Sequence, residues 1–539
     1  MYLKKFGIEN FRIFKDPVEF EFRPITILVG ENNSGKSTLL KALGFLHKNA
    51  NEKSIERIFP SKLNLNFPRL GITAPEHFFP DGSMDSIFRV HLSLEGTPNW
   101  GFFMFQEVLL SFTLNLEYPF PKGVDSFFLQ HFSFTSVTDN NEKLSLCTND
   151  KDEDFLRRKI WIKIEDTIII NWINELKNRA LELDWAYNLY FGDYFSNFEH
   201  GWVTSIPISE EKIKNAFLTK GISREELHRL CCMMFSINYI GENYLNLQKF
   251  PFSEKVEGFI NVLEDFLSKG SKFKFDHAFY VMGTPLRTND PLNDFFRDGL
   301  YDYFQTLRLF FSYEFKHLSN NRSTPKRYYS PEDIDDVYLN ISRKLLPSDK
   351  ERIVEILKNI LGVADDFEIQ DIEGYLKKLM IIKNGKRTNV VDMGYGITQL
   401  LPIILKPDEE KNNLYAYPKS WLISEPETGL HPSLQSKLAD LFAHLHSKSS
   451  SRFVIETHSE YIIRKLQYLI RQTSCPLSKE DVQIYYFYHP DELPPGENQI
   501  KSINIDEDGN LTDNFGPGFY DESSRISLEL WNLNTSQKN

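Results

Sequence analysis

Residues 30–38 read Gly30-Glu31-Asn32-Asn33-Ser34-Gly35-Lys36-Ser37-Thr38 and fit G-x-x-x-x-G-K-[ST], the pattern of a phosphate-binding P-loop. Glycine at the first and sixth positions permits backbone angles and a close approach that a Cβ atom would block. The N–H groups of such a loop point into one concavity and bind phosphate oxygens. Lysine adds a cation for the β- and γ-phosphates, and the serine hydroxyl is a ligand for Mg²⁺. The residues that we expect to bind ATP are Gly30, Asn32, Asn33, Ser34, Gly35, Lys36, Ser37 and Thr38, and the expected cofactors are ATP and Mg²⁺.

A P-loop lies between a buried strand and a helix, and the segments on either side of residues 30–38 have these two patterns. Residues 24–29 (Pro-Ile-Thr-Ile-Leu-Val) form a short apolar run, which is typical of a buried parallel strand. Leucine and alanine then recur at helical spacing between residues 39 and 46. The helix would begin at the phosphates, so the positive end of its dipole faces the negative charge. The order strand, loop, helix predicts an α/β fold.

Composition restricts the remaining possibilities. The chain has 539 residues, too many for one compact core, so we expect two or more units. It has no apolar run of 18 residues, and its first residues lack the apolar core of a signal peptide, so we expect a cytoplasmic protein without a membrane segment. Four cysteines do not make a disulfide framework, and no Cys/His spacing indicates zinc. The net charge of −13 opposes nonspecific binding to nucleic acid.

The pattern along the chain divides it into three parts. Residues 1–95 and 310–539 carry the motifs and are expected to form the two parts of an ATPase head with a mixed sheet and helices. Strands are predicted within 2–29 and at 87–94, and the segments 112–118 and 127–134 continue an antiparallel sheet. Residues 96–309 are predicted to be an inserted, mainly helical domain, with helices over 153–177, 212–237 and 247–269. A hairpin is predicted over 375–391, because Asn384-Gly385 is a strong two-residue turn signal.

Two further strands end in groups suited to hydrolysis. Residues 421–427 (Trp-Leu-Ile-Ser-Glu-Pro-Glu) are an apolar strand followed by acids, and ligands of α/β sheets bind at the carboxyl ends of parallel strands. Glu425 is the candidate to polarise the attacking water and to support the metal together with Ser37. Residues 452–458 (Arg-Phe-Val-Ile-Glu-Thr-His) are a second strand, and His458 is the candidate to contact the γ-phosphate or the water; the alternative is a buried structural histidine.

A third glycine-rich segment lies between these motifs. Residues 392–399 read Asp-Met-Gly-Tyr-Gly-Ile-Thr-Gln and open an apolar helix. The start of a helix is an anion-binding position. Gly394, Gly396 and Gln399 are the candidates in this segment.

These motifs, in this order, resemble the RecF/SMC-like branch of the ABC-type ATPases, and within it the OLD-like ATPases of bacterial anti-phage defence. The residues that carry the resemblance are the opening Leu3-Lys4-Lys5-Phe6-Gly7-Ile8-Glu9-Asn10-Phe11-Arg12, the segment Glu425-Pro426-Glu427-Thr428-Gly429-Leu430-His431-Pro432, the arginine motif Arg322-x-x-Pro325-x-Arg327-Tyr328 and the terminal Pro517-Gly518-Phe519-Tyr520-Asp521-Glu522. The resemblance covers residues 1–95 and 310–525 and leaves out the middle.

The resemblance implies that two heads sandwich ATP, so that the chain forms at least a homodimer. The segment of Gly394, Gly396 and Gln399 would contact the γ-phosphate held by the other subunit's P-loop, Glu425 would be the catalytic base and His458 the switch histidine. Arg322 and Arg327 would contact phosphate or nucleic acid, or else form a structural salt bridge.

The chain departs from the family pattern at two places. Ser424 stands where ABC-type ATPases usually carry the aspartate that supports Mg²⁺, and an uncharged serine would reduce metal affinity or turnover. The usual Ser-Gly-Gly of the trans segment is replaced by Gly394-Tyr395-Gly396. Gln106 and Gln130 are weak candidates for the Q-loop glutamine of this family.

Three functions remain open from the sequence. The first is the ATPase subunit of a defence complex, similar to the Septu ATPase and to versions attached to retrons. There a separately encoded HNH nuclease, or a reverse transcriptase with nucleic acid, is the partner, and the ATPase has no nuclease activity of its own. The second is a RecF-like DNA-repair ATPase that clamps DNA itself. The third is a scaffold that binds ATP and hardly hydrolyses it, which Ser424 makes credible.

Overall fold

The computed structural model divides the chain into two compact units, which are described separately. One comprises Met1–Phe20 and Phe45–Ser312, and the other comprises Glu21–Gly44 and Tyr313–Asn539. The structure describes residues 2–51, 307–312, 325–330, 347–405, 420–472, 477–493, 498–516, 518–522 and 525–530, together with the helices and strands named below and isolated residues between them. Within these described residues, no helix is both long enough and apolar enough to span a bilayer.

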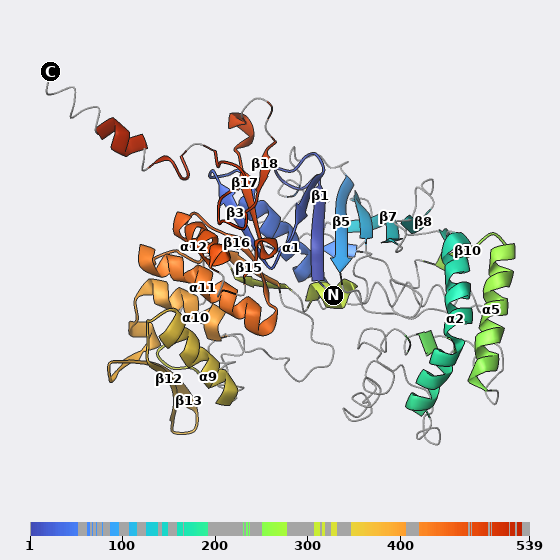
Figure 1. The fold of residues 1–539 in the computed structure, drawn as a ribbon, viewed down its shortest axis with the longest axis horizontal. Coiled ribbons are helices and arrows are strands. Elements are labelled where there is room, and N and C mark those ends of the chain that lie inside the picture. Colours follow the sequence, from blue (N-terminus) through green and yellow to red (C-terminus); the bar gives the residue numbers. More distant parts are fainter. Residues whose placement is uncertain are drawn as a thin grey trace. The chain divides into compact units, whose positions relative to one another are not determined.

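A six-stranded sheet forms the centre of the second unit (Figure 1). Its strands, in spatial order, are β11 (Phe315–Leu318), β15 (Ser420–Ser424), β16 (Arg452–Glu456), β3 (Ile25–Gly30), β17 (Val482–Phe487) and β18 (Ile500–Ile503). The first five are parallel, and β18 runs antiparallel to β17. Every residue of β3, β15 and β17 is buried, as expected of a parallel sheet that is covered on both faces. The predicted strands at 24–29, 421–424 and 452–456 are therefore confirmed.

Helices pack beside this sheet in one apolar core (Figure 1). They are α9 (Pro347–Glu355), which continues as a π-helix over Ile356–Ile360, α10 (Tyr395–Leu405), α11 (Pro432–Ser449) and α12 (Glu460–Arg471). Helix α1 (Lys36–Asn51) follows the P-loop directly, which confirms the order strand, loop, helix.

A small three-stranded sheet confirms the predicted hairpin. Its strands are β12 (Asp366–Ile372), β13 (Leu376–Lys383) and β14 (Lys386–Asn389), all antiparallel. Asn384 and Gly385 form the turn with φ values of 49° and 75°. Two successive positive φ angles are the geometry for which Asn-Gly is preferred.

A nine-stranded antiparallel sheet belongs mainly to the first unit. Its strands are β1 (Tyr2–Glu9), β2 (Val18–Glu21), β4 (Lys62–Asn64), β5 (Ile87–Glu95), β6 (Glu107–Asn115), β7 (Ser126–Val137), β8 (Lys143–Thr148), β9 (Lys159–Ile164) and β10 (Lys272–Asp276). Along β5 the buried Phe88, Val90 and Leu92 alternate with partly exposed residues, the period of a half-buried strand. Helices α2 (Asp166–Phe191) and α5 (Phe252–Ser268) pack against each other in the same unit.

The middle of the chain differs from its prediction. The helix predicted over 153–177 is wrong for Lys159–Ile164, which is strand β9 between β8 and β10. The sequence there alternates Lys-Ile-Trp-Ile-Lys-Ile, and this period of two is that of a strand. The sheet continues past residue 95 through β6 and β7, which overlap the strands predicted at 112–118 and 127–134. The described part of 96–309 thus contains strands β6 to β10 besides two helices, where a mainly helical domain is expected. Most of the helix predicted over 212–237 lies outside the described residues.

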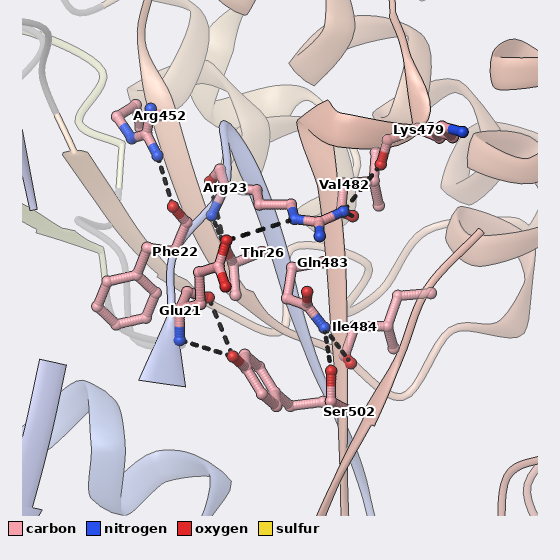
Figure 2. Close-up of polar contacts among 11 residues, drawn as sticks. Glu21, Phe22, Arg23, Thr26, Arg452, Lys479, Val482, Gln483, Ile484 and Ser502 are labelled. Carbon is pink, nitrogen blue, oxygen red and sulfur yellow. Dashed lines mark hydrogen bonds and ion pairs between the residues drawn. The ribbon is translucent and has the colours of Figure 1, made fainter. Parts of the chain in front are cut away.

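Polar contacts hold the amino-terminal ends of the parallel strands together (Figure 2). The guanidinium of Arg23, just before β3, donates to the carbonyl oxygens of Lys479 and Val482 at 3.0 and 3.1 Å. Arg452 at the start of β16 donates to the carbonyl oxygen of Phe22 at 2.7 Å. These bonds fix β3, β16 and β17 side by side at one end, so their other ends are held close together as well.

Candidate nucleotide-binding site

The P-loop has the backbone of an anion-binding loop. Gly30, Asn33 and Gly35 have positive φ values of 136°, 58° and 109°. A Cβ atom on Gly30 would lie 2.2 Å from the carbonyl oxygen of Phe487, the residue beside it on β17. Glycine is therefore required there for contact with the neighbouring strand as well as for its φ angle. The N–H groups of Thr38 and Leu39 both donate to the carbonyl oxygen of Gly35, at 3.0 and 3.4 Å, so the loop turns directly into α1. The start of a helix is a position that favours an anion.

Lys36 holds its charge inside the loop. Its side chain is 4% exposed, and its Nζ donates to the carbonyl oxygens of Gly30 and Glu31. Burial lowers the pKa of Lys36, and the nearby Glu456, Glu425 and Glu31 counteract this shift. A buried ammonium that donates to carbonyl oxygens is suited to bind phosphate oxygens, because they would add negative charge that stabilises it.

The Ser37 hydroxyl donates a hydrogen bond to Oε1 of Glu456, and the two oxygens are 2.5 Å apart. Ser37 is exposed, whereas Glu456, the last residue of β16, is 5% exposed. Sequence reasoning missed Glu456, although it follows an apolar strand in the same way as Glu425. The missing information is the strand order, which places β16 directly beside β3.

Glu425 lies beyond the end of β15, in a strained backbone conformation. Its φ of 45° is in the left-handed region, which non-glycine residues rarely adopt and which often marks functional sites. Its N–H donates to the carbonyl oxygen of Glu456 at 2.7 Å, and its carboxylate accepts from the Thr428 hydroxyl at 3.2 Å. The backbone of Glu425 is thus bonded to β16, and its partly exposed carboxylate is held by the turn that follows β15.

Glu427 positions the backbone of His458. Its Oε1 accepts from the His458 N–H at 2.7 Å, and burial raises the pKa of Glu427. The side chain of His458 is exposed; the partial burial of its ring and the charge of Lys36 lower its pKa. Neutral imidazole both donates and accepts a proton, as contact with a phosphate or a water requires. Because its side chain is exposed, His458 is not the buried structural histidine of the alternative prediction.

The third glycine-rich segment opens α10 as predicted. Gly394 is exposed, and a Cβ atom there would meet nothing within 4 Å. Gly396 packs against the turn that follows Glu425, because a Cβ atom on it would lie 2.4 Å from the carbonyl oxygen of Gly429. The side chain of Gln399 is 3% exposed. Gly394 is thus accessible to a second molecule, whereas Gln399 is covered by its own chain.

The arginine motif is described only in part. Arg327 forms a two-pronged ion pair with Asp392, at 3.0 and 2.5 Å, and this pair raises the pKa of the arginine. The structure therefore shows the salt bridge that was one of the two alternatives for Arg327. Arg322 and Gln106 lie outside the described residues, and for Gln130 only the backbone in β7 is described.

The C-terminal region contributes packing next to the site. Phe515, Phe519 and Tyr520 form an aromatic cluster with Tyr486 of β17. The segment 506–509 is a turn, closed by a bond from the Gly509 N–H to the Asp506 carbonyl oxygen at 3.0 Å. In the described part of the chain, no group of three or more His, Cys, Asp and Glu side chains has the arrangement of a metal site.

The residues present fit Mg²⁺–ATP. A buried lysine, a helix start and two glycines with positive φ suit the phosphates. A hydroxyl beside a carboxylate suits Mg²⁺, a hard cation whose remaining coordination positions are usually filled by phosphate oxygens and water. Lys36 and the loop N–H groups would hold the phosphates. Bound Mg²⁺ would neutralise developing charge on the γ-phosphate.

The chain belongs to the family described as AAA ATPase domain, whose model matches residues 1–463. This match confirms the predicted class: the protein is an ATPase. A second model, described as Protein of unknown function (DUF3696), matches residues 477–530. No curated protein matches the chain.

Solved structures of Smc head domains are similar to this one. One is the head with an extended coiled coil bound to the C-terminal domain of ScpA, from Pyrococcus furiosus; it has 11% identity and a TM-score of 0.35 and covers 98% of this chain and 99% of that one. The head with a coiled coil and joint from Pyrococcus yayanosii has 11% identity and a TM-score of 0.36, and the match covers 94% of this chain and 98% of that one. The head domain from Thermotoga maritima has 10% identity, a TM-score of 0.31 and coverage of 94% and 100%.

Proposed function

We propose that this ATPase binds Mg²⁺–ATP at residues 30–38 and hydrolyses it with Glu425 as the general base. The observation that supports the proposal is the meeting of the ends of β3, β15 and β16, which brings Lys36, Ser37, Glu425 and Glu456 close together. Lys36 would bind the β- and γ-phosphates, and His458 would contact the γ-phosphate or the attacking water. Glu425 would accept the proton of that water.

Two variants test this assignment. Lys36→Ala should abolish binding of a fluorescent ATP analogue, because the cation of the loop is lost. Glu425→Gln should bind the analogue as the wild type does but hydrolyse ATP roughly 10²- to 10⁴-fold more slowly, the usual contribution of a general base. Glu480→Gln, which makes the same charge change at an exposed position away from these strand ends, is the control. Wild-type turnover in Glu425→Gln would exclude Glu425 as the base.

We also propose that two heads pair around ATP. The resemblance supports this, and so does the exposed Gly394 at the start of α10, next to the turn after Glu425. Gly394→Arg should keep ATP binding and prevent the ATP-dependent dimer of the Glu425→Gln protein, measured by light scattering. Gly394→Ala, whose methyl group enters open space, is the matched control and should dimerise. A dimer of equal stability in Gly394→Arg would contradict pairing through this segment.

The motif set further supports a role as the cytoplasmic ATPase subunit of an anti-phage defence complex, in which its ATP state controls a separately encoded nuclease of the HNH type. The tagged chain, purified from its native operon with ATP present, should bring down a small nuclease, or a reverse transcriptase with nucleic acid. Glu425→Gln should remove protection in a phage challenge.

A RecF-like clamp is the second candidate, on the basis of the same motifs. It predicts a bare homodimer that binds DNA only with ATP. A protein that binds ATP with negligible turnover would instead be the nucleotide-gated scaffold. Turnover per subunit and DNA binding of the purified chain therefore separate the three functions.

A further inference from the structure

We infer, on the basis of the proposed ATP-binding function, that Glu456 is the protein carboxylate that ligates the Mg²⁺ of bound ATP, together with Ser37. The starting observation is the direct bond between the Ser37 hydroxyl and Oε1 of Glu456. These two residues are 419 positions apart in the sequence, and the fold brings a hydroxyl and a carboxylate into contact at the end of the P-loop.

The strand register explains why the carboxylate lies there. Ser424 on β15, Glu456 on β16 and Leu28 on β3 are neighbours in register across three parallel strands. Adjacent strands lie about 4.8 Å apart, and residues in register point to the same face. Glu456 is therefore one strand nearer to the P-loop than Ser424. Ser424 carries no charge, but Glu456 provides a carboxylate on β16, the strand that pairs directly with β3.

The geometry of the pair suits magnesium. Mg²⁺ takes six oxygen ligands at about 2.0–2.1 Å, so two adjacent ligands are about 2.9 Å apart. The Ser37 and Glu456 oxygens are 2.5 Å apart and need to separate by only a few tenths of an ångström. Ser37 is exposed, so the cation and its waters can reach the pair. One hydroxyl and one carboxylate leave the remaining positions for phosphate oxygens and water, as is usual for Mg²⁺ in ATPases.

Glu425 is arranged for a different task. Its left-handed backbone places it in the turn after β15, and its carboxylate is bonded to Thr428 of that same turn. Its only described bond to β16 is made by its backbone N–H. We therefore assign the metal to Glu456 and leave the proton transfer to Glu425, where sequence reasoning gave Glu425 both tasks.

Electron paramagnetic resonance of Mn²⁺ as the probe ion tests the assignment without measuring turnover. In the presence of saturating ATP, Glu456→Gln should weaken Mn²⁺ binding roughly 10- to 100-fold, the loss produced when a supporting group of a metal site is removed. ATP binding in EDTA should be at least as tight as in the wild type, because one negative charge near the phosphates is gone. Glu460→Gln, an equal charge change four residues along on α12, should leave Mn²⁺ affinity unchanged.

The outcomes are distinguishable. If the wild type binds no ATP with or without metal, the proposed function itself fails. If the wild type binds Mn²⁺–ATP and Glu456→Gln binds Mn²⁺ equally well, only the present inference is overturned. A loss in Glu425→Gln instead of Glu456→Gln would also overturn it, by assigning the metal to Glu425.

A second variant covers the case in which Glu456→Gln does not fold. Glu456→Cys should raise the preference of the ATP complex for Cd²⁺ over Mg²⁺ at least tenfold, because a thiolate ligand selects soft ions. A residue that only supports the fold would leave the ratio of the two affinities unchanged, and that result would overturn the assignment.

Discussion

The two large sheets of this protein use charged residues in different ways. In the six-stranded sheet, β3, β15 and β17 are buried along their whole length, and polar groups gather beyond the strand ends. In the nine-stranded sheet, ion pairs join neighbouring strands: Arg89 of β5 pairs with Glu9 of β1 at 2.5 Å, and Lys5 of β1 pairs with Glu19 of β2 at 2.9 Å. The first arrangement gathers polar groups where the proposed ligand would bind, and the second pairs charge within the protein.

Strand direction explains the difference. The carboxyl ends of parallel strands meet at one edge, so segments hundreds of residues apart deliver Gly30, Glu425 and Glu456 to the same place. Antiparallel neighbours place the end of one strand beside the start of the next, and their polar residues meet across strands instead. We therefore expect substitutions near the carboxyl ends of the parallel strands to impair function more than substitutions in the antiparallel sheet.

Matched glycine substitutions give the largest expected contrast. Gly30→Ala places a methyl group 2.2 Å from backbone of β17 at a φ of 136°, and we expect it to destabilise the protein by more than about 4 kcal/mol and to abolish ATP binding. Gly7→Ala in β1 meets Cβ of His91 at 2.9 Å, and we expect a loss of about 1–3 kcal/mol with ATP binding retained. Urea unfolding and nucleotide titration measure both effects. Equal losses in the two variants would contradict the contrast.

Core truncations should separate function from stability. Ile455→Ala on β16 and Leu92→Ala on β5 each empty a fully buried site, and each should cost about 2–5 kcal/mol in the free energy of unfolding. Only Ile455→Ala, next to Glu456, should also weaken ATP binding, because the strand end that carries the carboxylate would shift. If Leu92→Ala reduced ATP affinity as strongly, the two sheets would not be functionally distinct.

Bound nucleotide should stabilise one sheet selectively. At roughly 100 times its Kd, a ligand of the folded state contributes about 2.7 kcal/mol. Hydrogen exchange with Mg²⁺–ATP should therefore slow for amides of β3, β16 and β17, whereas those of β1 and β5 change little. Uniform protection of both sheets would be evidence against this expectation.

The smallest effect is expected for an ion pair of the antiparallel sheet. Arg89→Ala removes the partner of Glu9, and because the pair is partly exposed it should cost no more than about 1 kcal/mol. The change in thermal midpoint, compared between low and high salt, measures it. A loss well above this value, independent of salt, would show that the pair acts as a buried one.

Local patterns predict much of this fold and site. The P-loop, the strands around residues 25, 422 and 454 and the Asn384-Gly385 hairpin are each specified by a few adjacent residues, and the structure confirms them. Glu456 was missed because its importance comes from the register between β16 and β3, which no short stretch encodes. Likewise, the pairing of Arg327 with Asp392 and the contact of Gly30 with Phe487 join distant segments. Strand β9 was mistaken for a helix because the prediction followed the composition of the longer segment 153–177, and the alternation within residues 159–164 was given no weight.

The position of β17 has a consequence for how such genes can be divided. The P-loop strand β3 lies between β16, within the segment matched by the ATPase family model, and β17, within the segment matched by the second model. A chain cut between residues 463 and 477 would leave β3 as a bare edge strand and remove the backbone against which Gly30 packs. We expect the two pieces to bind ATP only after they reassemble, because each piece alone lacks part of the six-stranded sheet. The boundary between the two models therefore does not separate independently folding modules.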